Sequence, residues 1–475
     1  MKKAVKILLA VGIPAAALAV AWGAGYSRYE NTFMPRTFIN KMNVSGMTAD
    51  EVKEKLDEEA AKYTLTVKER ENKTETISAN ALGIAYKDTG DVDKALADQN
   101  RALWFYESGQ SKSITVADDY TFSEKMTRQA AQNLAAMDPA NMTDPENASI
   151  VKGEDSFSIK EATSGTRLDP QKTENAIVDA VASRQDTIDL DENGLYVEPD
   201  VTADDGDLKA RVDALNKMLT VQVKYDMGDN RIYQPTAAEI MSWLVEGEDG
   251  TYSLDTAAVG KWVDKMAYDT DTFGLRRQFT THTGQVIELA GGGDYGWAMN
   301  KDKTTADLID RITNGTSGDA TPIYLYSANS RAKNDIGGTY AEVSIGEQMM
   351  YVYKDGQLAV ETPVVTGNEA KGTPTPSGSC WAIDAKKPNA QFSQNPVKVA
   401  CWLPFNGGCG LHDASWRSSF GGDIYKTNGS HGCVNTPPDA MNQVFSILEI
   451  GDPVIVYYTP DQPVGPQPTG TVTAG

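Results

Sequence analysis

Reactive side chains are scarce in this sequence of 475 residues, which contains four cysteines and three histidines. Four cysteines in so long a chain are too few for the disulfide framework that stabilises small secreted domains. Cys380 and Cys401 lie in two strand-like segments and could face each other, but sequence spacing does not establish the geometry of a disulfide. With 40% hydrophobic and 23% charged residues, the composition is that of a folded protein with hydrophobic cores.

Positively charged residues are also in the minority, with 44 lysines and arginines against 66 aspartates and glutamates and a formal net charge of −22. Proteins that bind nucleic acids need basic patches that neutralise phosphates, and we find none in this sequence. We therefore expect no nucleic-acid partner. The acidic balance favours solubility and indicates no particular ligand.

One long uncharged stretch, from residue 7 to residue 26, follows the three lysines Lys2, Lys3 and Lys6. A helix of this length rises about 30 Å, which is roughly the thickness of the hydrocarbon layer of a membrane. Because lysines favour the cytoplasmic side, the pattern predicts a cytoplasmic N-terminus over 1–6 and a transmembrane anchor in the cytoplasmic membrane over 7–26. The rest of this single-pass chain would then lie on the cell-wall side. The alternative is a cleaved signal peptide that ends near Ala19-Val20-Ala21.

Two regions between this stretch and the C-terminal part share a layout. In each, alternating apolar and polar residues predict a strand, at 63–67 and at 219–226, and an amphipathic helix follows later in the chain. Asp169 and Asp255 stand where they would cap these helices. We therefore expect an α+β unit that occurs twice, over 27–205 and 206–335.

Neither of these regions contains a nucleophile paired with a base. His282, in the segment FTTHTGQVIEL, stands alone in the sequence, and a lone histidine in a strand is usually structural. The chemistry of the protein is therefore expected in the C-terminal part of the chain.

The C-terminal part has the pattern of a mainly β domain over 336–459. Apolar and polar residues alternate over 340–353, and a turn signal follows at 354–357. The one good helix that the periodicity predicts runs over 437–450. Beyond the domain, residues 460–475 are rich in proline, glycine and threonine and are expected to be a disordered tail.

The segment NGSHGCVNTP, residues 428–437, brings His431 and Cys433 together in a glycine-bounded loop, and His412 lies shortly before them. A thiolate is the reactive form of cysteine, and a nearby imidazole promotes it by taking the thiol proton. His412 can reach Cys433 from another strand or loop, whereas His431 suits a position along the wall of the site. Gly432 leaves the approach open and lets backbone N–H groups turn toward a carbonyl, as an oxyanion hole requires. The segment therefore predicts a Cys–His acyl-transfer site.

Two other interpretations of these residues stay open at this point. One is a zinc site built from two cysteines and two histidines at ligand spacing, namely Cys409, His412, His431 and Cys433. The other is a buried structural cysteine with unrelated histidines. Glycine-rich loops rarely bury a side chain, which counts against the second interpretation.

The segment GLHDASWRSSFGGDIYKTNGSHGCVNTP resembles the active-site signature of the L,D-transpeptidases of the YkuD family. That signature is a histidine, a spacer of about this length, and then Ser/Thr-His-Gly-Cys-hydrophobic-Asn, and every fixed position is present. TPTPSG and GDPVIVYY are similar to parts of the same catalytic domain, and the resemblance extends over 340–458. RTFINKMNVSGMT and GGGDYGWAMNKD resemble the peptidoglycan-binding repeats that precede this domain in Gram-positive bacteria.

The resemblance implies a reaction and a role for each residue of the signature. Cys433 would attack the carbonyl between the third residue and D-Ala of a tetrapeptide stem of peptidoglycan, and an amine of a neighbouring stem would convert the thioester into a 3→3 cross-link. His412 would be the base, oriented by the main-chain carbonyl of Asp413. The other residues implied are His431 and Gly432 for the oxyanion hole, and Ser430, Asn435, Trp416, Arg417 and Tyr425 for contacts with the substrate.

The resemblance further implies that carbapenem β-lactams acylate Cys433, and we expect no cofactor and no metal. Two alternatives in function stay open. Water could resolve the thioester, which would make the protein an L,D-carboxypeptidase, or the protein could be a wall-binding or zinc-binding protein without activity. The expected fold is a multidomain one with an N-terminal transmembrane helix, two α+β domains and a C-terminal, mainly β L,D-transpeptidase catalytic domain that has one main helix.

Overall fold

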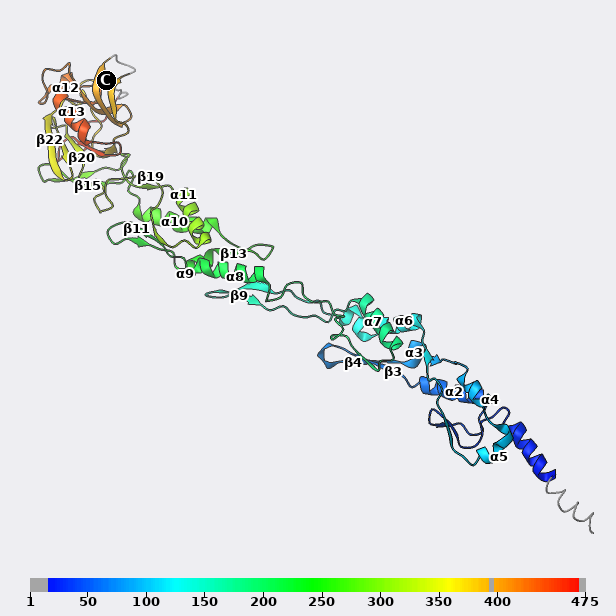
Figure 1. The fold of residues 1–475 in the computed structure, drawn as a ribbon. Coiled ribbons are helices and arrows are strands. Elements are labelled where there is room, and N and C mark those ends of the chain that lie inside the picture. The colour runs from blue at the N-terminus through cyan, green and yellow to red at the C-terminus, as the bar shows by residue number, and fades with distance from the viewer. Residues whose placement is uncertain (1–15, 393–396, 470–475) are drawn as a thin grey trace, which may run out of the picture. The chain divides into compact units, whose positions relative to one another are not determined.

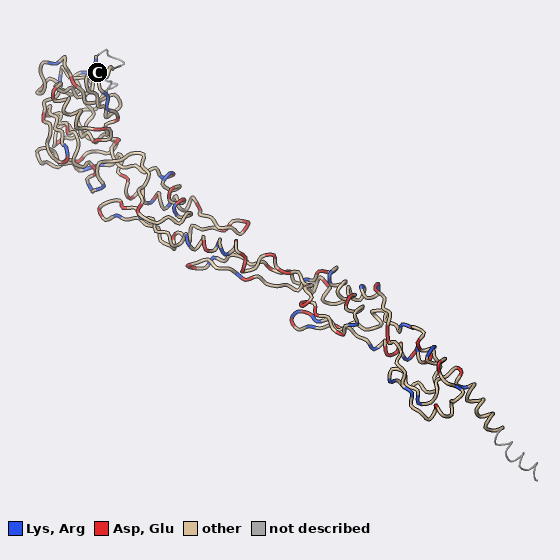
Figure 2. The backbone as a smooth tube through the Cα atoms, in the orientation of Figure 1, with Lys and Arg blue, Asp and Glu red and all other residues tan. Residues whose placement is uncertain are grey.

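The computed structural model describes residues 16–392 and 397–469 (Figure 1). Contacts within the chain divide it into two compact units. One unit comprises the chain up to Ser149 together with Ile159–Leu208, and the other comprises Ile150–Ser158 together with the chain from Lys209 onward. Lys and Arg are scattered among Asp and Glu along the described chain (Figure 2).

The N-terminal segment corrects the expected fold class. Residues 16–28 are helical, and no helix within 16–392 and 397–469 is long and apolar enough to cross a membrane. The prediction of a transmembrane anchor over 7–26 is therefore wrong for the part of it that the structure describes. The first part of that span, like the predicted cytoplasmic N-terminus over 1–6, lies outside the described residues.

Three small sheets share one arrangement of strands. In each, the central strand pairs antiparallel with the strand that follows it and parallel with a strand from much later in the chain. The sequence predicted such a unit twice, whereas the described chain contains this arrangement three times. The three small sheets, each given with its central strand first, are β1 (Thr37–Ile39) with β2 (Met42–Asn43) and β6 (Lys112–Ile114), β3 (Thr64–Lys68) with β4 (Thr74–Ser78) and β10 (Thr187–Asp189), and β11 (Val223–Asp226) with β12 (Ile232–Tyr233) and β18 (Gly318–Ala320).

Helices begin where the sequence predicted them. Asp169 caps α7 (Pro170–Ala182) by accepting a hydrogen bond from the backbone N–H of the third helical residue. Asp255 caps α10 (Thr256–Thr270) by accepting from two backbone N–H groups of its first turn. The apolar face of α7, which includes Ile177, packs into one buried core with β3 and β4.

The remaining elements before the C-terminal domain are short. In the first unit they are α2 (Ala49–Ala60), α3 (Ala79–Leu82), β5 (Ala85–Tyr86), α4 (Asp91–Ala97), α5 (Trp104–Glu107), β7 (Tyr120–Thr121) and α6 (Glu124–Gln132). Further along the chain are β8 (Ser149–Lys152), β9 (Phe157–Lys160), α8 (Gly206–Leu219), α9 (Ala237–Trp243), β13 (Leu244–Glu246), β14 (Tyr252–Leu254), β15 (Arg277–Thr280), β16 (Val286–Leu289), β17 (Ala298–Met299), α11 (Lys301–Asn314) and β19 (Tyr324–Tyr326).

The C-terminal domain is mainly β, as the sequence predicted, and α13 (Pro438–Ile447) is the helix expected over 437–450. Its five-stranded sheet has the strand order β22-β21-β20-β28-β23, and its four-stranded sheet has the order β24-β25-β26-β27. The other elements are β20 (Tyr340–Ser344), β21 (Met349–Lys354), β22 (Gln357–Pro363), β23 (Ser379–Ala382), β24 (Lys387–Gln391), β25 (Lys398–Asn406), β26 (Cys409–Asp413), α12 (Ile424–Asn428), β27 (Val434–Thr436) and β28 (Pro453–Tyr457).

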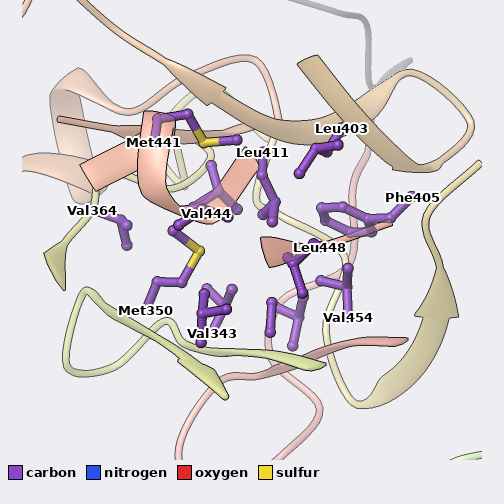
Figure 3. Packing of buried hydrophobic residues seen from close by; sticks show 14 of the residues in the cluster. Val343, Met350, Val364, Leu403, Phe405, Leu411, Met441, Val444, Leu448 and Val454 are labelled. Carbon is purple, nitrogen blue, oxygen red and sulfur yellow. The ribbon is translucent and has the colours of Figure 1, made fainter. Parts of the chain in front are cut away.

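Both sheets and α13 share one hydrophobic core (Figure 3). Val343 and Met350 come from the five-stranded sheet, Leu403 and Leu411 from the four-stranded sheet and Val444 from α13, and all are fully buried. Burying a side chain of this size contributes about 1.5–3 kcal/mol. The core therefore holds β26 and β27, the strands that carry the two halves of the signature, against the rest of the domain.

A hairpin from before the predicted domain boundary packs against the five-stranded sheet. It consists of β15 and β16, which pair antiparallel. Phe279 and Ile287 of this hairpin share a buried cluster with Cys380 of β23 and with Ile455 and Tyr457 of β28. The C-terminal domain is thus covered on this side by chain that the sequence assigned to the preceding α+β region.

His282 lies in the turn of this hairpin and is not isolated. Its Nδ1 lies 2.9 Å from a carboxylate oxygen of Glu342, and its Nε2 lies 3.2 Å from one of Glu347. Its ring stacks on that of Tyr351, with 3.8 Å between the ring centroids. The role of His282 is therefore structural: it connects the hairpin to the five-stranded sheet.

Part of the predicted disordered tail is ordered. Residues 460–469 lie along the C-terminal domain, where the backbone N–H of Gly465 donates to Ser377 Oγ (3.0 Å) and that of Thr469 donates to the carbonyl of Gly372 (3.0 Å). Hydrogen bonds fix this segment although it has few apolar side chains, and composition does not reveal them. Residues 470–475 lie outside the described residues.

The four cysteines are thiols, and no disulfide joins Cys380 to Cys401 in the described chain. Cys380 belongs to the buried cluster under the hairpin, and Cys401 belongs to the core of the C-terminal domain. The two side chains are therefore parts of different clusters.

Candidate active site

Two neighbouring strands of the four-stranded sheet carry the two halves of the signature. β26 and β27 pair in parallel, with Leu411 beside Val434 and His412 beside Asn435. Cys433 immediately precedes β27. The fold thus brings His412, near the end of β26, next to the loop that contains the cysteine.

The imidazole of His412 is buried and held in one tautomer. Its Nδ1 lies 2.8 Å from the main-chain oxygen of Asp413. A carbonyl oxygen only accepts hydrogen bonds, so Nδ1 carries the ring proton and Nε2 carries the lone pair. The rings of Phe392, Trp402 and Trp416 surround the imidazole, with centroids 5.6 to 5.8 Å away.

Cys433 is buried in the same place. It packs in a cluster with Phe392, Val399 and Trp402, and its exposed fraction is 0%. Two of these rings also flank His412, so the thiol and the imidazole share their surroundings. The burial differs from the expectation that a glycine-rich loop leaves the cysteine accessible, because side chains from β24 and β25 and the loop after β24 cover the sulfur.

Asn435 connects His412 to Arg417. Nε2 of the imidazole accepts, and the guanidinium only donates, so the amide is oriented with its nitrogen toward the ring and its oxygen toward the arginine. In this orientation the amide nitrogen lies 3.1 Å from His412 Nε2, and the amide oxygen lies 2.7 Å from Arg417 Nε. Arg417 also donates to the carbonyl of Asn428 (3.0 Å), and its burial lowers the pKa of the guanidinium.

Hydrogen bonds to Ser430, Thr375 and Cys409 hold the loop before Cys433 in shape. Gly432 has a φ of 125°, a conformation that favours glycine. Ser430 Oγ accepts from the N–H of Gly432 (3.0 Å) and donates to the carbonyl of Cys433 (2.6 Å). The carbonyl of Gly432 accepts from Thr375 Oγ1 and from Cys409 Sγ, each at 2.8 Å. Ser430, predicted to contact the substrate, therefore shapes the loop, and the N–H of Gly432, predicted for the oxyanion hole, is engaged by Ser430.

A cavity of about 280 Å³ adjoins the buried pair. Of the residues predicted to contact substrate or shape the site, it is lined by Trp416, Arg417, Ser430, His431 and Asn435. Tyr425 is not among its lining residues. The side chain of Tyr425 is 4% exposed and packs in the domain core, and its contact with the substrate stays a prediction.

The four residues of the alternative zinc site are not grouped as metal ligands in the described part of the chain. Within 16–392 and 397–469, no three His, Cys, Asp or Glu side chains are grouped so that they could hold a metal ion. Cys409 Sγ faces a backbone carbonyl, His412 Nδ1 faces another, and His431 is exposed.

Two family models match segments of the chain. Residues 338–456, which include His412 and Cys433, match the family model of the L,D-transpeptidase catalytic domain (YkuD). Residues 75–189 match a model described as "Putative peptidoglycan binding domain". A mutant Enterococcus faecium L,D-transpeptidase, known from its crystal structure, is 31% identical over 52% of this chain and 99% of its own, with a TM-score of 0.42. The chain belongs to the L,D-transpeptidase family.

Two further structures are similar to this L,D-transpeptidase. The catalytic domain of the E. faecium enzyme acylated by ertapenem, determined by NMR, is 40% identical over 26% of this chain and 98% of its own, with a TM-score of 0.23. The Ldtfm-avibactam carbamoyl enzyme is 31% identical over 53% of this chain and 99% of its own, with a TM-score of 0.43. No curated protein matches the chain.

Sequence reasoning missed several residues around the pair in this L,D-transpeptidase. Phe392 and Trp402 cover both reactive groups, and Thr375 holds the carbonyl of Gly432. Thr375 lies in the segment TPTPSG, which resembles the family, so that segment was the available signal. Phe392 and Trp402 are far from the motif, and only strand pairing brings them to the site. Cys409, considered as a zinc ligand, instead donates to the carbonyl of Gly432.

Proposed function

We propose that this L,D-transpeptidase forms 3→3 cross-links between peptidoglycan stem peptides through a thioester on Cys433. The observation that carries the proposal is the tautomer of His412, whose Nδ1 donates to the carbonyl of Asp413 and whose Nε2 can therefore take a proton. The ring of His412 contacts Phe392 and Trp402, which also pack against the Cys433 thiol, and an imidazole with a free lone pair near a thiol is what activates a cysteine nucleophile.

The reaction then follows in two halves. Nε2 of His412 takes the thiol proton as Cys433 Sγ attacks the carbonyl carbon of the third, L-configured residue of the donor. The C–N bond to D-Ala breaks, and the imidazolium gives its proton to the leaving amine. An amine of a second stem attacks the thioester, gives its proton to His412 and releases Cys433. The energy of the exchanged peptide bond is conserved in the thioester, so no ATP is needed.

The cavity beside the pair suits the donor stem. Arg417 lines it and has more donors than its contacts with Asn435 and Asn428 use, so it can bind a carboxylate of the donor. Trp416, 48% exposed, offers a flat apolar surface. Cys433 is covered by Phe392, Val399 and Trp402, so the donor carbonyl reaches the sulfur only when a covering side chain moves.

The same thiolate is proposed to react with carbapenems, since the E. faecium catalytic domain is described as acylated by ertapenem. Peptidoglycan lies outside the cytoplasmic membrane, so we place the activity on the cell-wall side. The matched segment over 75–189 would supply a second contact with peptidoglycan.

Intact-mass measurement of the full chain after incubation with ertapenem tests the nucleophile. We expect one covalent adduct on the wild type and none on Cys433→Ala. Incubation with disaccharide-tetrapeptides followed by mass spectrometry tests the transfer. Cross-linked dimers support the proposal, whereas tripeptides without dimers would show an L,D-carboxypeptidase instead.

A further inference from the structure

A second thiol lies against Cys433, and the proposed mechanism does not use it. Cys409 begins β26 and is fully buried. Its Sγ lies 2.8 Å from the carbonyl oxygen of Gly432, the residue before Cys433. Sγ of Cys433 lies 3.6 Å from the carbonyl oxygen of Gly408, the residue before Cys409. Each sulfur therefore contacts the peptide group that precedes the other cysteine.

The two cysteines lie at the same end of two neighbouring strands. Leu411 of β26 pairs with Val434 of β27 in parallel. Cys409 lies two residues before Leu411, and Cys433 lies one residue before Val434, in the loop that leads into β27. The contact of each sulfur with the peptide group before the other cysteine therefore brings the two side chains together.

The two sulfurs also interact electrostatically. Burial raises the pKa of the Cys409 thiol, and a hydrogen bond to the Cys433 sulfur and its charge raise it further. Cys409 therefore keeps its proton when Cys433 has lost its own. In such a pair one sulfur is the nucleophile and the other is a thiol in contact with it.

We propose that Cys409 is a resolving cysteine, which forms a reversible disulfide with Cys433 when a peroxide oxidises the active site. The thiolate of Cys433 attacks one oxygen of the peroxide, the O–O bond breaks, and Cys433 becomes a sulfenic acid while hydroxide or alkoxide leaves. The sulfur of Cys409 then attacks the sulfenic sulfur, and its proton leaves with the sulfenic oxygen as water. Two thiols are oxidised and one peroxide is reduced. A dithiol reductant reverses the disulfide.

The benefit of this pair depends on the proposed function, because the disulfide preserves a thiol that the cross-linking reaction needs. Without a resolving thiol, a sulfenic acid proceeds to sulfinic and sulfonic acids, which thiols do not reduce. Cys380 and Cys401 lie elsewhere: Cys380 is buried in the cluster under the hairpin, and Cys401 Sγ donates to Asn442 Oδ1 (3.4 Å). Cys401 offers a matched control, as it is also a buried cysteine of the four-stranded sheet.

The test is oxidation of the full chain by hydrogen peroxide, followed by intact mass, peptide mapping and a second incubation with ertapenem. We expect the wild type and Cys401→Ser to become about 2 Da lighter, with a linked Cys409–Cys433 peptide pair. Both should lose the ertapenem adduct and recover it after treatment with dithiothreitol. Cys409→Ser should instead gain about 32 or 48 Da on Cys433 and stay unreactive after dithiothreitol.

Acylation before oxidation separates the two proposals and reports folding. Cys409→Ser that accepts ertapenem before peroxide treatment has a folded site, so its later behaviour reports on the missing thiol. If the reduced wild type is acylated but gains about 32 or 48 Da on Cys433 under peroxide without any linked peptide, the resolving role is overturned and the proposed function stands. If the reduced wild type is not acylated, the proposed function fails. The presence or absence of the linked Cys409–Cys433 peptide pair still tests whether the disulfide forms.

Discussion

His412 and His282 differ in what surrounds them. His412 has Nδ1 on a main-chain carbonyl and Nε2 beside an amide, and its ring contacts Phe392 and Trp402, which pack against Cys433. His282 has Nδ1 and Nε2 beside the carboxylates of Glu342 and Glu347 and a tyrosine ring against its face.

This difference separates a reactive imidazole from a structural one. Each nitrogen of His282 lies beside a carboxylate oxygen of the five-stranded sheet or of the turn after β20, so its contacts tie the hairpin to the sheet. His412 has one nitrogen fixed by a carbonyl and the other available as an acceptor. The partners of a histidine therefore indicate its role. The following substitutions test this comparison.

The largest effect is expected for Cys433→Ala. It removes the sulfur that the proposed base activates, so covalent labelling by ertapenem should be lost completely. Intact mass measures the adduct, and Cys401→Ala serves as the matched control, because it removes another buried thiol of the same sheet. An adduct that persists on Cys433→Ala would contradict the assignment of the nucleophile.

His412→Gln should reduce the rate of acylation about 10²- to 10⁴-fold, as expected for the loss of a general base. His282→Gln should leave that rate within about twofold, since its contacts are at the hairpin. Stopped-flow fluorescence during acylation measures both rates on the folded proteins. Equal losses in the two variants would remove the distinction between the histidines.

Glu342→Ala should act on stability. This fully buried carboxylate accepts hydrogen bonds from the backbone N–H of His282 (3.0 Å) and from Tyr457 Oη (2.8 Å), besides its contact with the ring. Removing it leaves these groups unsatisfied, and we expect a loss of about 3 kcal/mol in the free energy of unfolding. Urea denaturation followed by tryptophan fluorescence measures this loss. Glu347→Ala, at the half-exposed partner, should cost about 1 kcal/mol or less.

The smallest effect is expected for Asn435→Ala. It removes one neutral hydrogen bond to His412 Nε2, which contributes about 1 kcal/mol. Acylation by ertapenem should slow about five- to tenfold, with the unfolding free energy changed less than in Glu342→Ala. If Asn435→Ala slows acylation as much as His412→Gln does, the role of Asn435 goes beyond orienting the imidazole of His412.

Local patterns predicted the parts of the fold that depend on near neighbours. The caps at Asp169 and Asp255 and the apolar face of α13 are encoded within a few residues of each element. His412 and Cys433 were predicted from a motif that lies within one continuous segment of the sequence. The structure adds that β26 and β27 are adjacent and parallel, which explains how that spacer brings the two residues together.

Long-range pairings were not predictable from the sequence. β2 and β6 have only two and three residues, too few for a visible alternation, so the first small sheet was missed. The contacts of His282 join residues about sixty positions apart, and the cover of Cys433 comes from β24, β25 and the loop after β24. In each case the contact depends on the tertiary fold, and neither segment carries a periodic pattern that would predict it.

The late third strand of each small sheet affects how the nascent chain acquires its structure. β10 pairs Thr187 with Thr66, and β18 pairs Gly318 with Val223. The whole intervening stretch must therefore be synthesised before either sheet is complete. Until then, each sheet consists only of its two-stranded hairpin, which is marginally stable in water. Synthesis of this chain passes through successive intermediates with unpaired strand edges, the stage at which a chaperone would have most to protect.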